Sequence, residues 1–307
     1  MPLKLIALVP LLPMLAALWI AIGYTFAGNR GEAGEAMTRR VALSASALSL
    51  LAILALDLSA LLSGSSPGQV VLGQWLAVGD YQILISFTLD TLGLAMTTLV
   101  ALIAFLTLRF SVNYMHREAG FQRFFMVMSL FSGAMLLIVS AGNALLMFIG
   151  WELAGVSSYL LIAYAFDRPT APANASRAFV TNRIGDAGFI LALYLSFSWF
   201  GGVEWPTLLS GSVELESLGA GVLAGGFLIA ALAKSAQLPF APWIARALEG
   251  PTPSSAIFYG SLMVHAGVYL LIRLEPLFTQ VPALSPLLII IGLLSALYGW
   301  LVARVQS

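Results

Sequence analysis

The sequence predicts an all-α protein that crosses a membrane many times. Of the 307 residues, 60% are hydrophobic and only 9% are charged, whereas about 25% are charged in a typical soluble domain. The mean hydropathy is +0.96. Several apolar runs reach about 20 residues, the length that a helix needs to cross a bilayer. A soluble surface cannot be covered by so few charges, so we expect the apolar side chains to face lipid.

Charge and cysteine content exclude several functions. Fourteen Lys and Arg balance fourteen Asp and Glu, and without a basic block no nucleic-acid partner is expected. The absence of cysteine excludes thiolate-ligated clusters, disulfides and cysteine nucleophiles from this chain. Metal binding is not expected, since His116, the one histidine besides His265, lies in a connector. We also expect no cofactor and no catalytic residue in this chain. Whether the chain belongs to an enzyme stays open.

Nine membrane spans are predicted in three groups, joined by connectors too short for a soluble domain. Residues 1–121 carry the first three, 122–279 form a five-helix unit, and 280–307 hold the ninth. The spans lie at 3–27, 41–63, 84–109, 122–140, 144–165, 176–200, 218–248, 254–279 and 282–305. The first apolar run is too long for a cleaved signal, so we interpret it as a helix.

Arginines are concentrated in the connectors of one side. They are Arg30, Arg39, Arg40, Arg109, Arg117, Arg123, Arg168, Arg177, Arg246 and Arg304. Lys4 and Arg273 fall on the other side. The positive-inside rule predicts that the N-terminus lies outside and the C-terminus in the cytoplasm. We expect a multi-pass protein of the bacterial cytoplasmic (inner) membrane.

The seventh span is too long for one crossing and contains Pro239 and Pro242. Because proline lacks an amide hydrogen and clashes with the preceding turn, we expect the helix to break here. Free carbonyls at membrane depth need protein or water partners, so the break predicts a polar interior. The alternative is a helix that ends before an interfacial stretch.

Seven ionisable residues fall inside the predicted spans. They are Asp57, Asp90, Glu152, Arg183, Asp186, Lys234 and His265. A charge at mid-membrane costs about 2.5–3.5 kcal/mol, so these groups must be paired, hydrated or used. Helix rise places Glu152, Asp186 and His265 at a similar depth, roughly 12–16 Å into their spans, and Lys234 is near the middle of the seventh. Such a row is what a proton path requires.

Glu152 and Lys234 are the strongest candidates for that path. Small residues around Glu152 permit close helix approach, and Ser157 and Ser158 can hold water or hydrogen-bond across helices. A buried lysine can be charged or neutral according to the position of its partner. The alternatives are a structural ion pair for Glu152 and a lysine that extends to the membrane surface.

The remaining charged groups have less certain roles. His265, with Tyr259 nearby, could relay protons, or it could be a neutral donor to a carbonyl. Arg183 and Asp186, three residues apart on one helix, are best interpreted as a local ion pair. Asp90 could either pack helices together or line a cavity, and Asp57 has no evident partner in the sequence.

These motifs resemble the antiporter-like, proton-conducting subunits of complex I and of multisubunit Na⁺/H⁺ (Mrp) antiporters. The similarity rests on 89–94 (LDTLGL), 111–115 (SVNYM), 150–162 (GWELAGVSSYLLI), 183–186 (RIGD), 233–240 (AKSAQLPF), Trp243 and 251–256 (PTPSSA). The resemblance implies that Glu152 and Lys234 are the coupled pair of a proton half-channel. It also implies two inverted five-helix repeats, of which the fourth to eighth spans supply one. The ninth would begin an incomplete second repeat. Either a second membrane chain supplies the other half, or this chain conducts by a reduced path.

One local pattern departs from the respiratory members of that family. They typically have a histidine where this chain has Tyr259, and here a histidine follows six residues later, as His265. This stretch is more similar to the membrane subunit of DAB-type inorganic-carbon accumulation complexes. That resemblance implies a large cytoplasmic partner, similar to carbonic anhydrase, that contains zinc.

Three functions follow as hypotheses. The first is a subunit that passes protons, in preference to Na⁺, through Glu152, Lys234 and His265 and thereby drives CO₂ or bicarbonate uptake by its partner. The second is a cation-translocating subunit of a respiratory or Mrp-type complex. The third is a non-conducting membrane scaffold that anchors a soluble enzyme.

Overall fold

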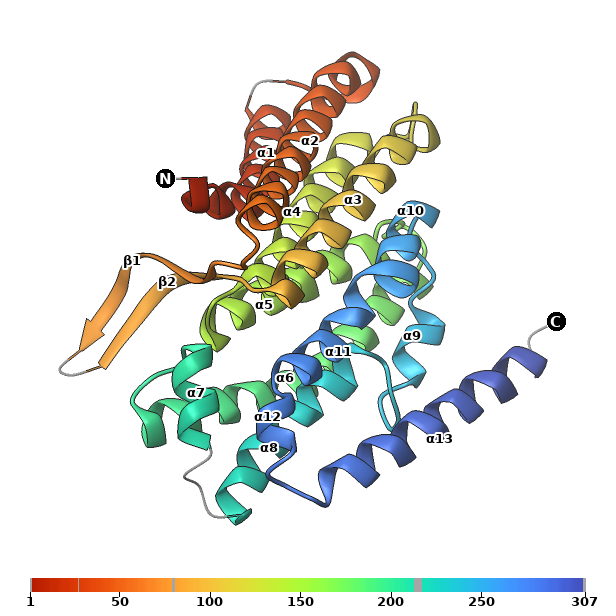
Figure 1. Cartoon of the computed structure of the whole chain (residues 1–307). Coiled ribbons are helices and arrows are strands. Elements are labelled where there is room, and N and C mark those ends of the chain that lie inside the picture. The colour runs from red at the N-terminus through yellow and green to blue at the C-terminus, as the bar shows by residue number, and fades with distance from the viewer. Residues whose placement is uncertain (1, 27, 79–80, 213–216, 306–307) are drawn as a thin grey trace.

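A computed structural model describes residues 2–26, 28–78, 81–212 and 217–305. In these ranges the chain forms a helical bundle with one two-stranded antiparallel hairpin (Figure 1). The N-terminal elements are η1 (Pro2–Ala7), α1 (Leu8–Thr25), α2 (Gly31–Ser63), β1 (Gly68–Val78), β2 (Tyr81–Leu89) and α3 (Thr91–Tyr114). The central elements are α4 (Phe121–Ser140), α5 (Ala144–Ile162), α6 (Thr170–Phe200), α7 (Trp205–Ser212) and α8 (Ser217–Lys234). The C-terminal elements are α9 (Pro242–Arg246), α10 (Thr252–Ser255), η2 (Ala256–Ser261), α11 (Met263–Arg273), α12 (Glu275–Phe278) and α13 (Leu284–Val305).

The predicted polytopic helical fold is confirmed. Among the described residues, seven helices are long and apolar enough to span a membrane, and the apolar stretch Leu218–Lys234 is shorter. Each of the nine predicted spans contains a helix. α6 is long enough, at 31 residues, but carries several charges.

The third span was predicted to begin too early. Residues 81–89 form β2, which pairs with β1, and α3 starts only at Thr91. Short apolar runs rich in β-branched and aromatic residues cannot be distinguished from buried helix by hydrophobicity alone. The all-α prediction therefore missed a hairpin that projects from the bundle (Figure 1).

Helix α4 forms the centre of the bundle. Nearly all of its residues are buried, and it packs against α1, α2, α3, α5 and α11. A second layer consists of α6 and α8, which lie against each other, with α5 beside α6 (Figure 1). Helix α13, by contrast, buries none of its residues and runs apart from the other helices.

Close contact between α6 and α8 depends on glycine. A Cβ at Gly185 would lie 2.3 Å from the Cβ of Ala233, far inside van der Waals contact. This close approach places the end of α8, with Lys234, against the middle of α6. The packing of these two helices therefore determines where the buried charges meet.

The base of the hairpin is fixed by one carboxylate. Glu204 Oε2 accepts hydrogen bonds from Gln69 Nε2 and Ser86 Oγ, both at 2.6 Å, and Oε1 accepts one from Asn143 Nδ2 at 2.9 Å. Asn143 also caps α5 by accepting a bond from the Leu146 amide at 2.8 Å. Glu204 thus connects both strands to the start of α5.

Candidate proton-transfer site

The predicted break in the seventh span is confirmed. Helix α8 ends at Lys234, and the chain then turns before the short helix α9. The carbonyls released by the break have partners: Trp243 Nε1 donates to the oxygen of Ala233 at 2.9 Å, and the Gln237 amide to that of Leu232 at 2.9 Å. The Leu238 amide donates to Ser295 Oγ of α13 at 3.0 Å.

Four of the predicted ionisable residues meet beside this break. Arg183 of α6 forms ion pairs with Glu152 of α5 and with Asp186, the latter at 2.8 Å between Nη2 and Oδ2. Trp151 Nε1 donates to Asp186 Oδ1 at 2.6 Å. Lys234 Nζ donates to the carbonyl oxygen of Trp151 at 3.1 Å and lies 4.8 Å from the centre of its ring. We call these five residues the charge cluster.

The sequence predicted Glu152 and Lys234 as the coupled pair, and the structure places other groups between them. Among the described residues, no carboxylate forms an ion pair with Lys234, and Glu152 is paired with Arg183. The spacing of Arg183 indicated a pair with Asp186 alone, whereas Arg183 contacts both Asp186 and Glu152. Sequence reasoning gave no role to Trp151, although it stands next to Glu152 in the motif.

The formal charges of the cluster balance, and most of its charged atoms are buried in the protein. Two carboxylates face one guanidinium and one ammonium, so the formal charge is zero when all four are ionised. Lys234 is 1% exposed and Asp186 3%, so Arg183 and Lys234 compensate carboxylates that would otherwise be too costly to bury. Glu152 Oε1 is buried and has no hydrogen-bond partner among the described residues.

A glycine makes room for the Arg183 guanidinium beside Lys234. A Cβ at Gly155 would lie 2.7 Å from Arg183 Nη2 and 3.7 Å from Lys234 Nζ. Ser157 and Ser158, which were predicted to hold water or to bond across helices, donate to carbonyls of their own helix, those of Leu153 at 2.7 Å and Gly155 at 2.8 Å.

The structure does not bring His265 to the cluster. Gly267 faces α8, since a Cβ there would meet the Ala231 carbonyl oxygen at 2.3 Å. Two residues along a helix turn by about 200°, and His265 is accordingly on the exposed side of α11. Tyr259 belongs to η2, and its side chain lies outside the described part of the structure. A relay through His265 would need groups other than those of the cluster.

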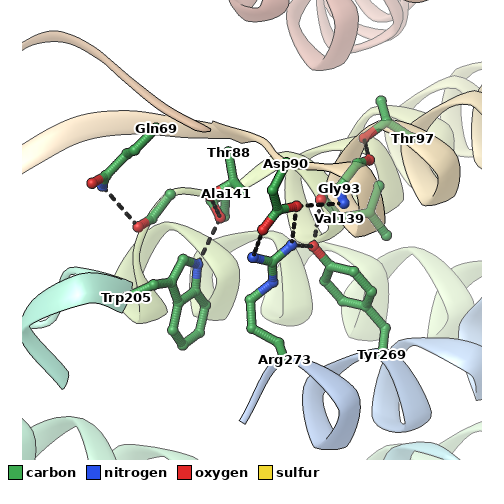
Figure 2. Close-up of polar contacts among 11 residues, drawn as sticks. Gln69, Thr88, Asp90, Gly93, Thr97, Val139, Ala141, Trp205, Tyr269 and Arg273 are labelled. Atoms are coloured by element: carbon green, nitrogen blue, oxygen red, sulfur yellow. Dashed lines mark hydrogen bonds and ion pairs between the residues drawn. The ribbon is translucent and has the colours of Figure 1, made fainter. Parts of the chain in front are cut away.

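Asp90 lies outside the membrane-spanning helix to which it was assigned. It caps α3, with Oδ1 accepting the Gly93 amide at 2.7 Å, and it pairs with Arg273 at 2.6 and 3.0 Å (Figure 2). Arg273 also donates to the hydroxyl of Tyr269 at 2.8 Å, which donates to the Val139 carbonyl oxygen at 2.7 Å. Burial raises the pKa of Asp90, but the bonds from Arg273 and Gly93 outweigh it and hold that pKa below its ordinary value. Asp90 thus takes part in a set of contacts that joins α3, α11 and α4.

With this geometry established, comparison with known proteins identifies the class of protein. Residues 141–307 match the family described as "NADH:quinone oxidoreductase/Mrp antiporter, TM", and residues 75–125 match "NADH-Ubiquinone oxidoreductase (complex I), chain 5 N-terminus". The chain belongs to this family of antiporter-like membrane subunits, as its motifs predicted.

Individual relatives match most of the chain. It is 33% identical to NAD(P)H-quinone oxidoreductase subunit 5 of Paulinella chromatophora over 99% of its length, which covers 46% of that protein. It is 36% identical to NADH-quinone oxidoreductase subunit L of Mycobacterium tuberculosis over 73% of its length, which covers 36% of that protein. The chain therefore spans less than half the length of these curated relatives.

Two solved structures share the fold. The Mrp complex from Dietzia sp. has a chain that matches with a TM-score of 0.73 and 24% identity, over 90% of this chain and 28% of that one. The membrane-bound sulfane sulfur reductase, an archaeal respiratory complex, has a chain that matches with a TM-score of 0.77 and 18% identity. The match covers 94% of this chain and 57% of that one.

Proposed function

We propose that this chain is a proton-translocating subunit of a larger membrane complex and that the charge cluster is its proton-transfer site. The observation that supports this most directly is a series of contacts from Glu152 through Arg183 and Asp186 to Trp151 and Lys234. Trp151 takes part twice, with its indole N–H bonded to Asp186 and its backbone carbonyl to Lys234. The series joins α5, α6 and α8 beside a helix break. Ionisable groups inside a membrane mark ion pathways, and the family relationship supports the same function.

The cluster can transfer a proton by redistributing charge. Lys234 has no carboxylate partner within the described residues, so its charge depends on how close Asp186 lies. If Arg183 moves towards Glu152, Asp186 loses a partner and its negative charge favours a protonated Lys234. If Arg183 moves towards Asp186, the proton on Lys234 is less stabilised, and the buried Glu152 Oε1 can accept one. Arg183 is thus the element that couples the two ends.

The test is proton translocation by the intact complex in native membranes. Lys234→Ala and Glu152→Gln should abolish proton translocation. Assembly of the complex, measured by native electrophoresis, should be unchanged. Lys4→Ala removes an exposed lysine far from the cluster and should have no effect. If both cluster variants translocated protons at the wild-type rate, the proposal would be overturned. Protons would then pass elsewhere in the complex, and this chain would be a scaffold beside a conducting subunit.

The coupled process has two candidates. The relatives are named as subunits of quinone oxidoreductases, which supports a redox complex that holds its redox groups in other chains. The pattern around Tyr259 and His265 favours inorganic-carbon uptake with a zinc-containing cytoplasmic partner. One charge moving down 100 mV releases about 2.3 kcal/mol, enough to shift a partner's reaction by roughly fiftyfold in either case.

Purification of the native complex distinguishes these candidates. Co-purification of a large zinc protein, with loss of bicarbonate uptake on deletion of the chain, would establish carbon uptake. Co-purification of flavin- or quinone-linked subunits, with unchanged bicarbonate uptake, would establish the respiratory function. In either complex we expect another membrane chain beside this one.

A further inference from the structure

A second acidic site lies away from the charge cluster, between α2 and α3. Asp57 of α2 accepts a hydrogen bond from Thr98 Oγ1 of α3 at 2.5 Å. No described residue forms an ion pair with Asp57. The carboxylate therefore has one neutral donor and no compensating cation from the described protein.

Asp57 borders a cavity of about 580 Å³. Its walls are mainly apolar and include Ala60, Leu61, Leu94 and Ala95, and Ser65 and Ser66 also line it. Among the lining residues, all of which the structure describes, Asp57 is the one that carries a charge. The cavity thus combines hydrocarbon walls with a single negative group.

Asp57 lies near one boundary of the hydrocarbon core. It lies 17 residues beyond Arg40 on α2, or about 25 Å along the helix axis, and a hydrocarbon core is about 30 Å thick. With Arg40 at one boundary, Asp57 lies about one helical turn inside the other. A group at this level can be reached from the membrane surface.

The apolar surface continues from the cavity towards the membrane centre. Leu54, one turn deeper than Asp57 on α2, is 44% exposed, and Leu102, one turn deeper than Thr98 on α3, is 42% exposed. Leu61, on the other side of Asp57, is 79% exposed. An acyl chain could lie along these side chains while a polar headgroup stayed at Asp57.

From these features we infer that the cavity between α2 and α3 binds an aminophospholipid, whose primary ammonium pairs with Asp57. An ammonium offers three N–H donors, which suit a carboxylate with unused acceptor positions. This site is separate from the proposed proton-transfer function and does not depend on it.

Native mass spectrometry of the purified full-length chain or its complex tests the inference. The probes are phosphatidylethanolamine, phosphatidylcholine and phosphatidylglycerol, added at equal concentration. Phosphatidylethanolamine should be retained preferentially, because the choline headgroup has no N–H donor and the glycerol headgroup no positive charge. Asp57→Asn should reduce its retention by about tenfold, the size expected for loss of one charge-assisted hydrogen bond.

Two further variants keep the inference falsifiable. Leu61→Trp should block the cavity and reduce retention without changing any charge. Glu118→Gln, at an exposed acid in the α3–α4 connector, should leave retention unchanged. Free ethanolamine should not displace the lipid, because it lacks the acyl chains. Equal retention of the three lipids, displacement by ethanolamine, or unchanged retention by Asp57→Asn would overturn the inference.

Discussion

Arg273 and Asp90 lie 183 positions apart in the chain, and two hydrogen bonds join them. The pair fastens the last residue of α11 to the N-cap of α3 (Figure 2). Tyr269 extends the connection to the end of α4 through the Val139 carbonyl. Three helices are thus held together at the end of the bundle from which the hairpin projects.

This pair predicts a loss of stability in acid. The pKa of Asp90 is lowered in the folded chain, so its contribution is fully present above the unfolded value of about 3.9 and is lost as the pH falls through the folded value. The thermal unfolding temperature of the protein in lipid nanodiscs, measured from pH 7 to pH 3, should therefore fall at the acid end of this range. Asp90→Asn should make that fall smaller.

The control for this measurement is Glu275→Gln, which alters an exposed acid two residues after Arg273. This variant should show the same fall in unfolding temperature at low pH as the wild type. In a double-mutant cycle, Arg273→Gln should add little to Asp90→Asn, because both remove the same interaction. Additive losses of stability in the cycle, or an unchanged fall in unfolding temperature at low pH in Asp90→Asn, would show that the pair does not stabilise the fold.

The sequence predicted which charges are buried, but not how they connect. Periodicity and depth placed Glu152, Asp186 and Lys234 at one level, and all three meet in the charge cluster. The same reasoning could not orient side chains around a helix, so His265 was assigned to the row although α11 turns it outward. Spacing within one helix indicated Asp186 as a partner of Arg183. It could not reveal that Arg183 also reaches Glu152, because that contact depends on how α5 packs on α6.

Arg183 should be required both for stability and for proton translocation. Arg183→Gln leaves two carboxylates with one cation, and we expect it to destabilise the protein by about 3 kcal/mol, the lower end for a broken buried pair, since Arg183 is partly exposed. Translocation should fall to background. The measurements are thermal unfolding and proton uptake in the same membranes.

Arg183→Lys separates geometry from charge. A single ammonium cannot hold two carboxylates as a planar guanidinium can, so this variant should keep most of the stability but little of the translocation. Arg177→Gln, on the exposed side of the same helix, serves as the control. Wild-type translocation in Arg183→Lys would show that only the positive charge matters.

Trp151 is expected to matter through its N–H group. Trp151→Phe keeps an aromatic ring beside Lys234 but removes the donor to Asp186, which should cost about 1–3 kcal/mol and slow translocation. Trp205→Phe is the matched control, because it removes an indole bond to the Ala141 carbonyl at 2.8 Å, away from the cluster (Figure 2). It should lower stability without slowing translocation. Equal slowing in the two variants would rule out a specific role for Trp151.

Glu204 should control how firmly the hairpin is attached to the bundle. Glu204→Gln removes the charge that accepts bonds from Gln69, Ser86 and Asn143, and the loss of about 2 kcal/mol should accelerate amide hydrogen exchange in β1 and β2 by roughly thirtyfold. Exchange in α4 should not change, because α4 is held by its own buried contacts. Gln74→Ala, at an exposed hairpin position, should leave exchange in both strands as in the wild type. If Glu204→Gln also left it unchanged, the strands would be held by their mutual pairing, and the carboxylate would have no anchoring role.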